Sequence, residues 1–112
     1  MKLEKTLRSI TELIIRCCDP DEIILFGSYA KRNAHAGSDL DILVVGNFKG
    51  RQKYVTYIEI KDLLDQYFIK VDLHLVTPNE IALASKNHVS FLNSVQLHSV
   101  PLYRKQNNDR YI

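Results

Sequence analysis

The stretch that decides the fold is Gly27–Val45, GSYAKRNAHAGSDLDILVV, in which a Gly-Ser pair precedes an Asp-x-Asp pair and an apolar run follows at once. Asp39 and Asp41 are two residues apart, so on an extended backbone both side chains leave the same face. Two neighbouring carboxylates repel each other unless a cation lies between them. A divalent metal is the expected occupant, and the stretch therefore predicts metal-dependent phosphate chemistry.

Hydrophobic periodicity on both sides of this stretch alternates between helical and strand spacing. In chain order it predicts a helix carrying Leu3, Leu7, Ile10, Leu13 and Ile14, a strand at Glu22–Phe26, a short helix from Ser28 to Lys31, a loop at Asn33–Ser38, a strand at Leu40–Val45, a helix from Arg51 to Tyr67, a strand at Ile69–Val76, two weaker helical pieces at Asn79–Ala84 and Ser90–Leu97, and a last edge strand at Val100–Tyr103. This order predicts an α/β (α+β) fold, a small mixed β-sheet flanked by helices. The short connections predict mixed strand directions.

Length and composition favour one ordinary globular domain spanning residues 1–112. Hydrophobic residues make up 46% and charged residues 25%, and the net charge of +2 is too small to indicate nucleic acid. No apolar run approaches the ~20 residues of a membrane span. Adjacent Cys17 and Cys18 make a strained pair, so we expect reduced thiols and a cytoplasmic protein. The basic tail Tyr103–Ile112 is either frayed or a partner contact.

The Gly-Ser corner is suited to phosphate. Gly27 ends a strand and lets backbone amides approach a ligand closely, while the following helix start presents unpaired N–H groups. Ser28 adds a hydroxyl, and Lys31 or Arg32 could meet phosphate charge. Taken alone, the pair is more typical of a turn followed by an N-cap serine, and both cations could simply be solvated.

A third carboxylate strengthens the phosphate interpretation. Asp72 lies on the same face of its strand as Lys70, His74 and Val76, opposite the apolar face. With Asp39 and Asp41 it could hold two Mg²⁺ ions for in-line phosphoryl displacement. The alternative is a surface aspartate. For His74 we expect a satisfied or exposed side chain rather than a contact to nucleotide or partner.

With these residues assembled, the chain resembles the nucleotidyltransferase superfamily related to DNA polymerase beta, and most of all its single-domain branch, the minimal nucleotidyltransferase (MNT) proteins of prokaryotes. The family signature is a Gly-Ser, a short helix, Ser-Asp-x-Asp entering a strand, and an acidic residue on a later strand. Gly27-Ser28, Ser38-Asp39-Leu40-Asp41 and Asp72 match it, and the closing Val100–Tyr103 segment agrees. The resemblance covers most of the chain and predicts a nucleotidyltransferase-like fold.

The resemblance also implies roles. Asp39 and Asp41 would ligate metal, and Asp72 would complete the site and help activate an acceptor hydroxyl. Gly27 and Ser28 would bind the nucleoside triphosphate, with Ser38 in the motif and Lys31 near the phosphates. The family often has glycine five residues after the first Gly, where this chain has Arg32.

Minimal family members commonly occur beside a helical HEPN-domain protein, and several such pairs are toxin–antitoxin modules. The resemblance therefore implies an antitoxin that transfers AMP from ATP, with Mg²⁺, to a tyrosine of a HEPN toxin. The chain lacks the additional domain with which larger members bind RNA or antibiotics, which favours a protein acceptor. Homo- or hetero-oligomers are both compatible with this setting.

Two other classes of function share parts of this sequence pattern. Haloacid-dehalogenase-like phosphatases place Asp-x-Asp after an apolar strand, whereas here the apolar run Ile42–Val45 follows the motif, which disfavours phosphate hydrolysis. The stronger alternative is a binding module of the same fold that neutralises its partner by contact, with little or no catalysis. The three intact aspartates favour the enzyme, and Arg32 favours the binding module.

Overall fold

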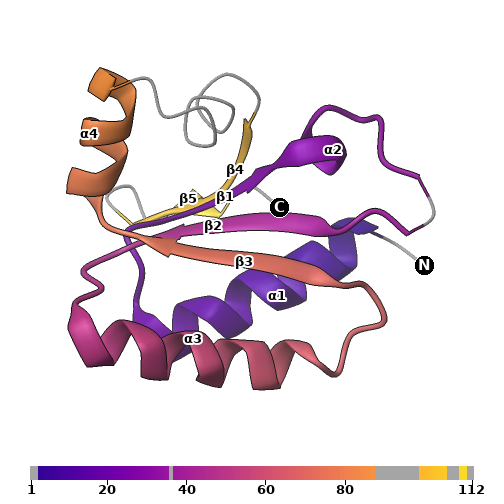
Figure 1. Cartoon of the computed structure of the whole chain (residues 1–112). Coiled ribbons are helices and arrows are strands. Elements are labelled where there is room, and N and C mark those ends of the chain that lie inside the picture. Colours follow the sequence, from indigo (N-terminus) through magenta and orange to yellow (C-terminus); the bar gives the residue numbers. More distant parts are fainter. Residues whose placement is uncertain (1–2, 36, 88–98, 106–108, 111–112) are drawn as a thin grey trace.

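Helices and strands follow one another in the predicted order (Figure 1). The computed structural model describes residues 3–35, 37–87, 99–105 and 109–110. The elements are α1 (Leu3–Cys18), β1 (Glu22–Phe26), α2 (Gly27–Ala30), β2 (Leu40–Val45), α3 (Gly50–Leu64), β3 (Val71–Val76), α4 (Pro78–Asn87), β4 (Ser99–Arg104) and β5 (Asp109–Arg110). The predicted helical piece at Ser90–Leu97 lies outside the described residues.

The strands form one mixed sheet in the order β3-β2-β1-β4-β5. β2 and β3 run parallel, while β1 is antiparallel to both β2 and β4. The prediction of a mixed sheet flanked by helices is therefore confirmed. Because β1 runs opposite to β2, the C-terminal end of β1 meets the N-terminal ends of β2 and β3.

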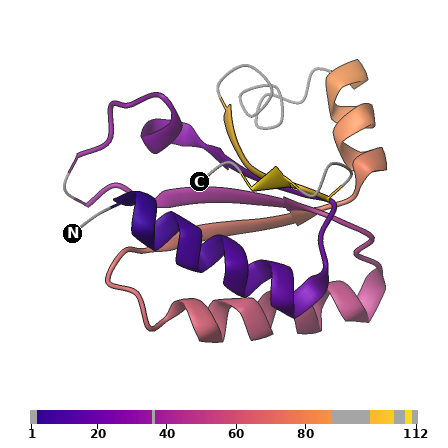
Figure 2. The ribbon, with the colours of Figure 1, turned by 180° about the vertical axis from the view of Figure 1, so that it is seen from behind.

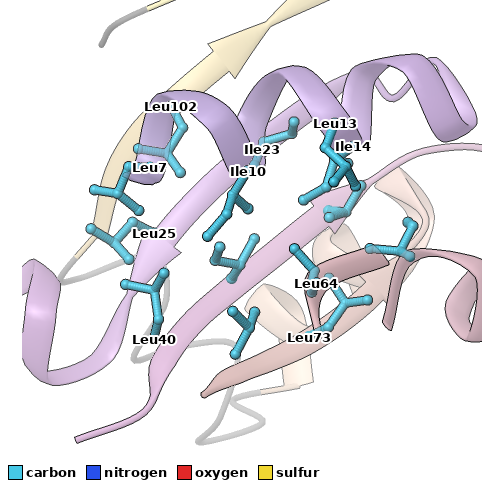
Figure 3. Close-up of a cluster of buried hydrophobic side chains, with 14 of the residues drawn as sticks. Leu7, Ile10, Leu13, Ile14, Ile23, Leu25, Leu40, Leu64, Leu73 and Leu102 are labelled. Carbon is cyan, nitrogen blue, oxygen red and sulfur yellow. The ribbon is translucent and has the colours of Figure 1, made fainter. Parts of the chain in front are cut away.

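The main core lies between one face of the sheet and the two long helices, α1 and α3 (Figures 1 and 2). Apolar residues three and four apart along α1 give it the buried stripe that faces the strands. Figure 3 shows the α1 side chains meeting those of the strands, among them Ile10, Ile14, Ile23 and Leu73. Along β2, alternation sends Leu40, Ile42 and Val44 into this core, so the odd-numbered residues point to the opposite face.

The opposite face is only partly covered. Phe26, Leu43, Val45 and Val76 form a second, smaller cluster there, against which Ile81 of α4 packs. α4 covers the end of the sheet where β3 terminates, and α2 lies at the other end (Figure 1). Polar side chains can therefore occupy this face near α2. No helix within the described ranges is both long and apolar enough to cross a membrane.

Several predicted boundaries shift. The third helix ends at Leu64 rather than Tyr67, because turns take over at Asp65 and Tyr67, whose amides bond back to Asp62 and Leu64. α4 is longer than predicted. Its start is fixed by a capping box in which Glu80 accepts from the Thr77 amide (2.9 Å) and Thr77 Oγ1 accepts from the Glu80 amide (3.1 Å).

The prediction of an edge strand at Val100–Tyr103 is wrong. β4 lies inside the sheet, between β1 and the two-residue β5, which pairs with Tyr103 and Arg104. The idea of a tail frayed from Tyr103 onward is wrong for the same reason, since this part of the tail belongs to the sheet. β5 has only two residues, too few to leave a periodic pattern in the sequence.

Candidate active site

Three strand ends bring the predicted site residues together. Phe26 is the register partner of Asp41, and Asp41 is in turn the partner of Asp72. Gly27 follows Phe26 directly, so the Gly-Ser corner, the Asp-x-Asp pair and the third aspartate meet at one end of the sheet. Asp41 and Asp72 lie on the face away from α1 and α3, the face of the second apolar cluster. The predicted convergence of two neighbouring strands on a corner is what the register produces.

Gly27 is required by two separate constraints. Its φ of +74° lies in the left-handed region that residues with a Cβ rarely adopt. A Cβ built at this position would overlap Asp41 Oδ2 and lie 2.9 Å from Asp41 Cγ. The backbone of the corner and the second aspartate of the motif are thus closely packed. The sequence predicted a close approach of this glycine to a ligand, which stays a prediction.

The electrostatics of Asp41 are those of crowded carboxylates. Burial raises the pKa of Asp41 above its usual value, and the negative charges of Asp72 and Asp39 raise it further. His74 acts in the opposite direction, and a side-chain hydrogen bond with Asp72 also favours the protonated form of Asp41. Repulsion between neighbouring carboxylates is therefore a property of the folded protein, as the spacing predicted.

Asp72 has the imidazole of His74 as a neighbour. Its Oδ2 lies 3.3 Å from His74 Nε2, and the Asp72 side chain is 51% exposed. The His74 ring also packs against Phe26, with ring centroids 5.6 Å apart. His74 is thus a satisfied histidine, in agreement with the prediction. These two contacts hold the His74 imidazole beside the carboxylates, on the same face of the sheet.

Asp39 and Ser38 lie at the entrance to β2. Asp39 forms a long ion pair of 4.0 Å with Lys70, whose side chain is largely exposed. Ser38 Oγ accepts a hydrogen bond from the His35 amide at 2.9 Å, and the Ser38 amide donates to the His35 carbonyl. Ser38 therefore closes the loop that presents the Asp-x-Asp pair. Sequence reasoning did not identify Lys70 as a partner of Asp39, because the parallel register that aligns them appears only in the sheet.

The helix after Gly27 is a single turn. The N-cap of α2 is Phe26, with no side-chain hydrogen bond, so the alternative of an N-cap role for Ser28 is wrong. Lys31 is exposed beyond the end of this turn. Arg32 has a φ of +61°, so the position where the family often has glycine is a left-handed position here as well. The arginine keeps the glycine-like backbone and adds an exposed cation to the loop.

The donor set suits a divalent metal in its chemistry. Asp39, Asp41 and Asp72 offer carboxylate oxygens, the ligands that Mg²⁺ prefers. The pKa of Asp41 is raised by burial and by repulsion from Asp72 and Asp39, and a cation would relieve the repulsion. Within the described part of the chain, no three such side chains are gathered closely enough to hold a metal ion. Asp39 and Asp72 instead contact Lys70 and His74. Binding of metal would compete with these two pairs.

A cavity of about 680 Å³ opens beside the Asp-x-Asp pair. Asp39 is the one site aspartate among its lining residues, which are Thr6, Tyr29, Gly37, Ser38, Asp39 and Gln66–Lys70. The Phe68 side chain is fully exposed. Hydrophobic periodicity predicts Tyr67 as the end of the third helix, whereas it lies beyond the end of α3 and lines this cavity. The cavity is large enough for a small organic ligand next to the carboxylates.

The sequence matches the family model of the nucleotidyltransferase domain over residues 2–98, and the chain belongs to this family. It is 31% identical over 94 residues to a Methanocaldococcus jannaschii protein named "putative protein adenylyltransferase". The match covers 75% of this chain and 64% of that protein. The chain thus spans somewhat less than two thirds of this relative.

Solved structures share the fold. A "putative nucleotidyltransferase" from Sulfolobus solfataricus superposes with a TM-score of 0.62 at 18% identity, covering 96% of this chain and 86% of that one. A toxin–antitoxin structure with AMP-PNP superposes with a TM-score of 0.55 at 23% identity, covering 90% of this chain and 77% of that one. The expectation of a nucleotidyltransferase fold is confirmed.

Proposed function

We propose that this nucleotidyltransferase-family protein transfers AMP from ATP to a hydroxyl of a protein acceptor, with Mg²⁺ bound by the three aspartates. The observation that supports it most directly is the register pairing of Asp41 with Asp72 beside Gly27. The relative named as a protein adenylyltransferase and the toxin–antitoxin neighbour with AMP-PNP agree with a nucleotide donor and a protein partner. A tyrosine of a HEPN toxin is the acceptor we propose, and the protein would act as its antitoxin.

Each residue would have a distinct part. Gly27 and Ser28 would bind the triphosphate through the amides and hydroxyl of the corner, with Lys31 and Ser38 at its border. Asp39 and Asp41 would hold Mg²⁺, and Asp72 would complete the metal site. A bound Mg²⁺ neutralises triphosphate charge and polarises the phosphoryl oxygens.

The transfer needs no reactant besides ATP and the acceptor hydroxyl. The acceptor oxygen forms a bond to the α-phosphorus of ATP, the bond between that phosphorus and the bridging oxygen breaks, and pyrophosphate leaves. Asp72 would take the proton of the acceptor hydroxyl. His74 Nε2 lies 3.3 Å from Asp72 Oδ2, so the imidazole would hold this carboxylate in place for the step.

The test is labelling of a defined acceptor. Purified protein, ATP labelled at the α-phosphate, Mg²⁺ and the protein encoded by the neighbouring gene are expected to give a labelled neighbour. Combining Asp39→Asn with Asp41→Asn is expected to abolish the label. Label that persists in the double variant contradicts the assignment of the metal site.

A binding module is the second candidate. It is favoured by the lack, among the described residues, of three ligating side chains already gathered for a metal. If contact alone neutralises the partner, the double variant still forms the complex and still suppresses the partner's activity. A double variant that binds the partner without suppressing it rejects this candidate.

A further inference from the structure

The open edge of the sheet at β3 has unused backbone groups. Among the strands that the structure describes, β3 pairs only with β2. The Leu40 amide donates to the Lys70 carbonyl (2.8 Å), and the Gly46 amide donates to the Val76 carbonyl (2.9 Å). In a parallel ladder this fixes the alternation, so even-numbered residues of β3 bond to β2 and odd-numbered ones turn their N–H and C=O outward.

One outward carbonyl already has a partner. Lys61 of α3 reaches across and donates to the Val71 carbonyl at 2.7 Å. This bond agrees with the alternation and protects the first part of the edge, in the way that lysines often do on edge strands. Among the described strands, none lies beside the outward groups of Leu73 and Leu75. The two residues are only 3% and 4% exposed, and both line the hollow between β3 and α3 through which an added strand would reach them.

Two hollows run along this edge, between β3 and α3, which lies beneath it in Figure 1. One of about 450 Å³ is bordered by Leu73–Val76 on the strand and by Lys53, Tyr54 and Tyr57 on the helix. The other, of about 270 Å³, continues past Val71 toward Ile69. Tyr54 is 67% exposed, so an aromatic wall stands beside the open backbone. Together the hollows follow the whole length of β3.

The charged side chains that line these hollows indicate which kind of ligand fits them. Their charged lining consists of three lysines, Lys53, Lys61 and Lys70, against the single carboxylate Asp65. Outward N–H and C=O groups in alternation are matched only by an extended polypeptide, and the lysines complement acidic side chains. The edge therefore fits an extended acidic peptide.

We propose that the acceptor protein binds through an extended acidic segment that adds to the sheet beside β3. The proposal rests on the function proposed above. Residues of an added strand alternate between the two faces, and those on the face of Asp72 would have their Cβ about 5 Å from a directly opposite neighbour. A hydroxyl side chain there lies beside the carboxylate that would take its proton. Acceptor recognition and acceptor chemistry would thus share one strand.

The test uses amide hydrogen exchange without ATP, so it is independent of transfer. In the free protein the Leu73 and Leu75 amides should exchange faster than the His74 amide, which bonds to β2. A random copolymer of glutamate and tyrosine should slow exchange at Leu73 and Leu75, whereas a copolymer of lysine and tyrosine should not bind. Absence of binding by the acidic copolymer, or protection elsewhere on the protein, overturns the proposal.

A matched pair of charge reversals gives the second readout. Lys53→Glu should weaken binding of the acidic copolymer about tenfold, equivalent to one lost charge pair. Lys49→Glu changes an exposed lysine outside both hollows and should leave binding within about twofold of the wild type. Equal effects of the two substitutions overturn the proposal. The proposal is also overturned if sedimentation shows a dimer and the Leu73 and Leu75 amides are protected from exchange without peptide. A second copy of the chain then occupies the edge of β3.

The two proposals fail in different ways. If no acceptor is labelled with AMP but the acidic copolymer still protects the β3 edge, the proposed function fails and the docking edge stands. If a tyrosine acceptor is labelled equally by the wild type and by Lys53→Glu, with unchanged KM, the function stands and the docking edge fails.

Discussion

Gly27 has no space for a side chain, because Asp41 fills the volume that a Cβ would take and the backbone has a φ of +74°. Gly27→Ala should displace the Asp41 carboxylate and cost about 1–3 kcal/mol of unfolding free energy. AMP transfer should fall by at least about tenfold, since a misplaced metal ligand removes transition-state stabilisation. Urea unfolding and the labelling assay measure the two effects. Full activity in this variant would mean that Asp41 does not need its present position.

Arg32 allows a test of the departure from the family pattern. A left-handed conformation costs a residue with a Cβ roughly 1–2 kcal/mol, and glycine loses about 0.5–1 kcal/mol in chain entropy. Arg32→Gly should therefore stabilise the protein by about 0.5–1 kcal/mol in urea unfolding. Arg32→Ala keeps the Cβ and removes only the guanidinium, so it should not stabilise. If both variants bind ATP less tightly than the wild type, the guanidinium contacts the phosphates.

Residue spacing predicted which faces the aspartates occupy, but it did not predict the side chains that they contact. The two-residue spacing of Asp39 and Asp41, and the alternation that put Asp72 and His74 on one face, follow from local backbone geometry. The Asp39–Lys70 contact depends on which strand lies beside which and in what register. Local sequence contains no such information, and this is why Lys70 was not identified.

The C-terminal turn of α1 carries two half-buried cysteines whose thiol pKa values are raised. Burial raises the pKa of the Cys18 thiol to about 12, and that of Cys17 is raised as well, mainly by burial. Both thiols are free, and Cys18 Sγ donates to the Ile14 carbonyl (3.4 Å). In a Cys17→Ser variant, Cys18 should be alkylated by iodoacetamide at pH 7 at least about a hundredfold more slowly than after unfolding. Comparable rates in the two states contradict a buried thiol.

The same helix should show a pH dependence with a definite sign. The pKa of Cys18 is higher in the folded protein than its usual value of 9.0, so its contribution to stability is complete below pH 9. That contribution is lost as pH rises from 9.0 through about 12. Cys18→Ser should flatten the decline of the unfolding free energy in this alkaline range, measured by urea unfolding at several pH values. An identical decline in the variant assigns it to other groups.

Strands and helices were predictable from the sequence wherever a hydrophobic periodicity continued over several residues. The alternation in β3 and the apolar stripe of α1 both reflect burial on one face, which the sequence records directly. The position of β4 inside the sheet depended on the two-residue β5, which is too short to leave a pattern. The early end of α3 is likewise a matter of turn hydrogen bonds, not of hydrophobic spacing.

The fold separates its core from its site, since α1 and α3 bury one face of the sheet and the aspartates occupy the other. Charge at the site therefore affects stability without contributing to packing. The pKa of Asp41 is raised by burial and by neighbouring carboxylates, so the folded state binds this proton more tightly than the unfolded chain does. The sign follows: stability is complete below the usual pKa of 3.8 and falls as pH rises through the raised value.

This separation leads to a prediction about metal. At pH 7 the repulsion is present, and Mg²⁺ should relieve it, raising the unfolding free energy by about 2.7 kcal/mol when free Mg²⁺ is a hundred times Kd. The stabilisation should shrink as pH is lowered toward the pKa of Asp41, because protons then compete with the metal. Asp41→Asn removes the repulsion without changing the core, so it should raise the melting temperature in the absence of metal. It should also abolish the response to Mg²⁺, which thermal unfolding with and without Mg²⁺ at pH 5 and pH 7 measures. A Mg²⁺ response of the same size in Asp41→Asn would place the metal away from the three aspartates.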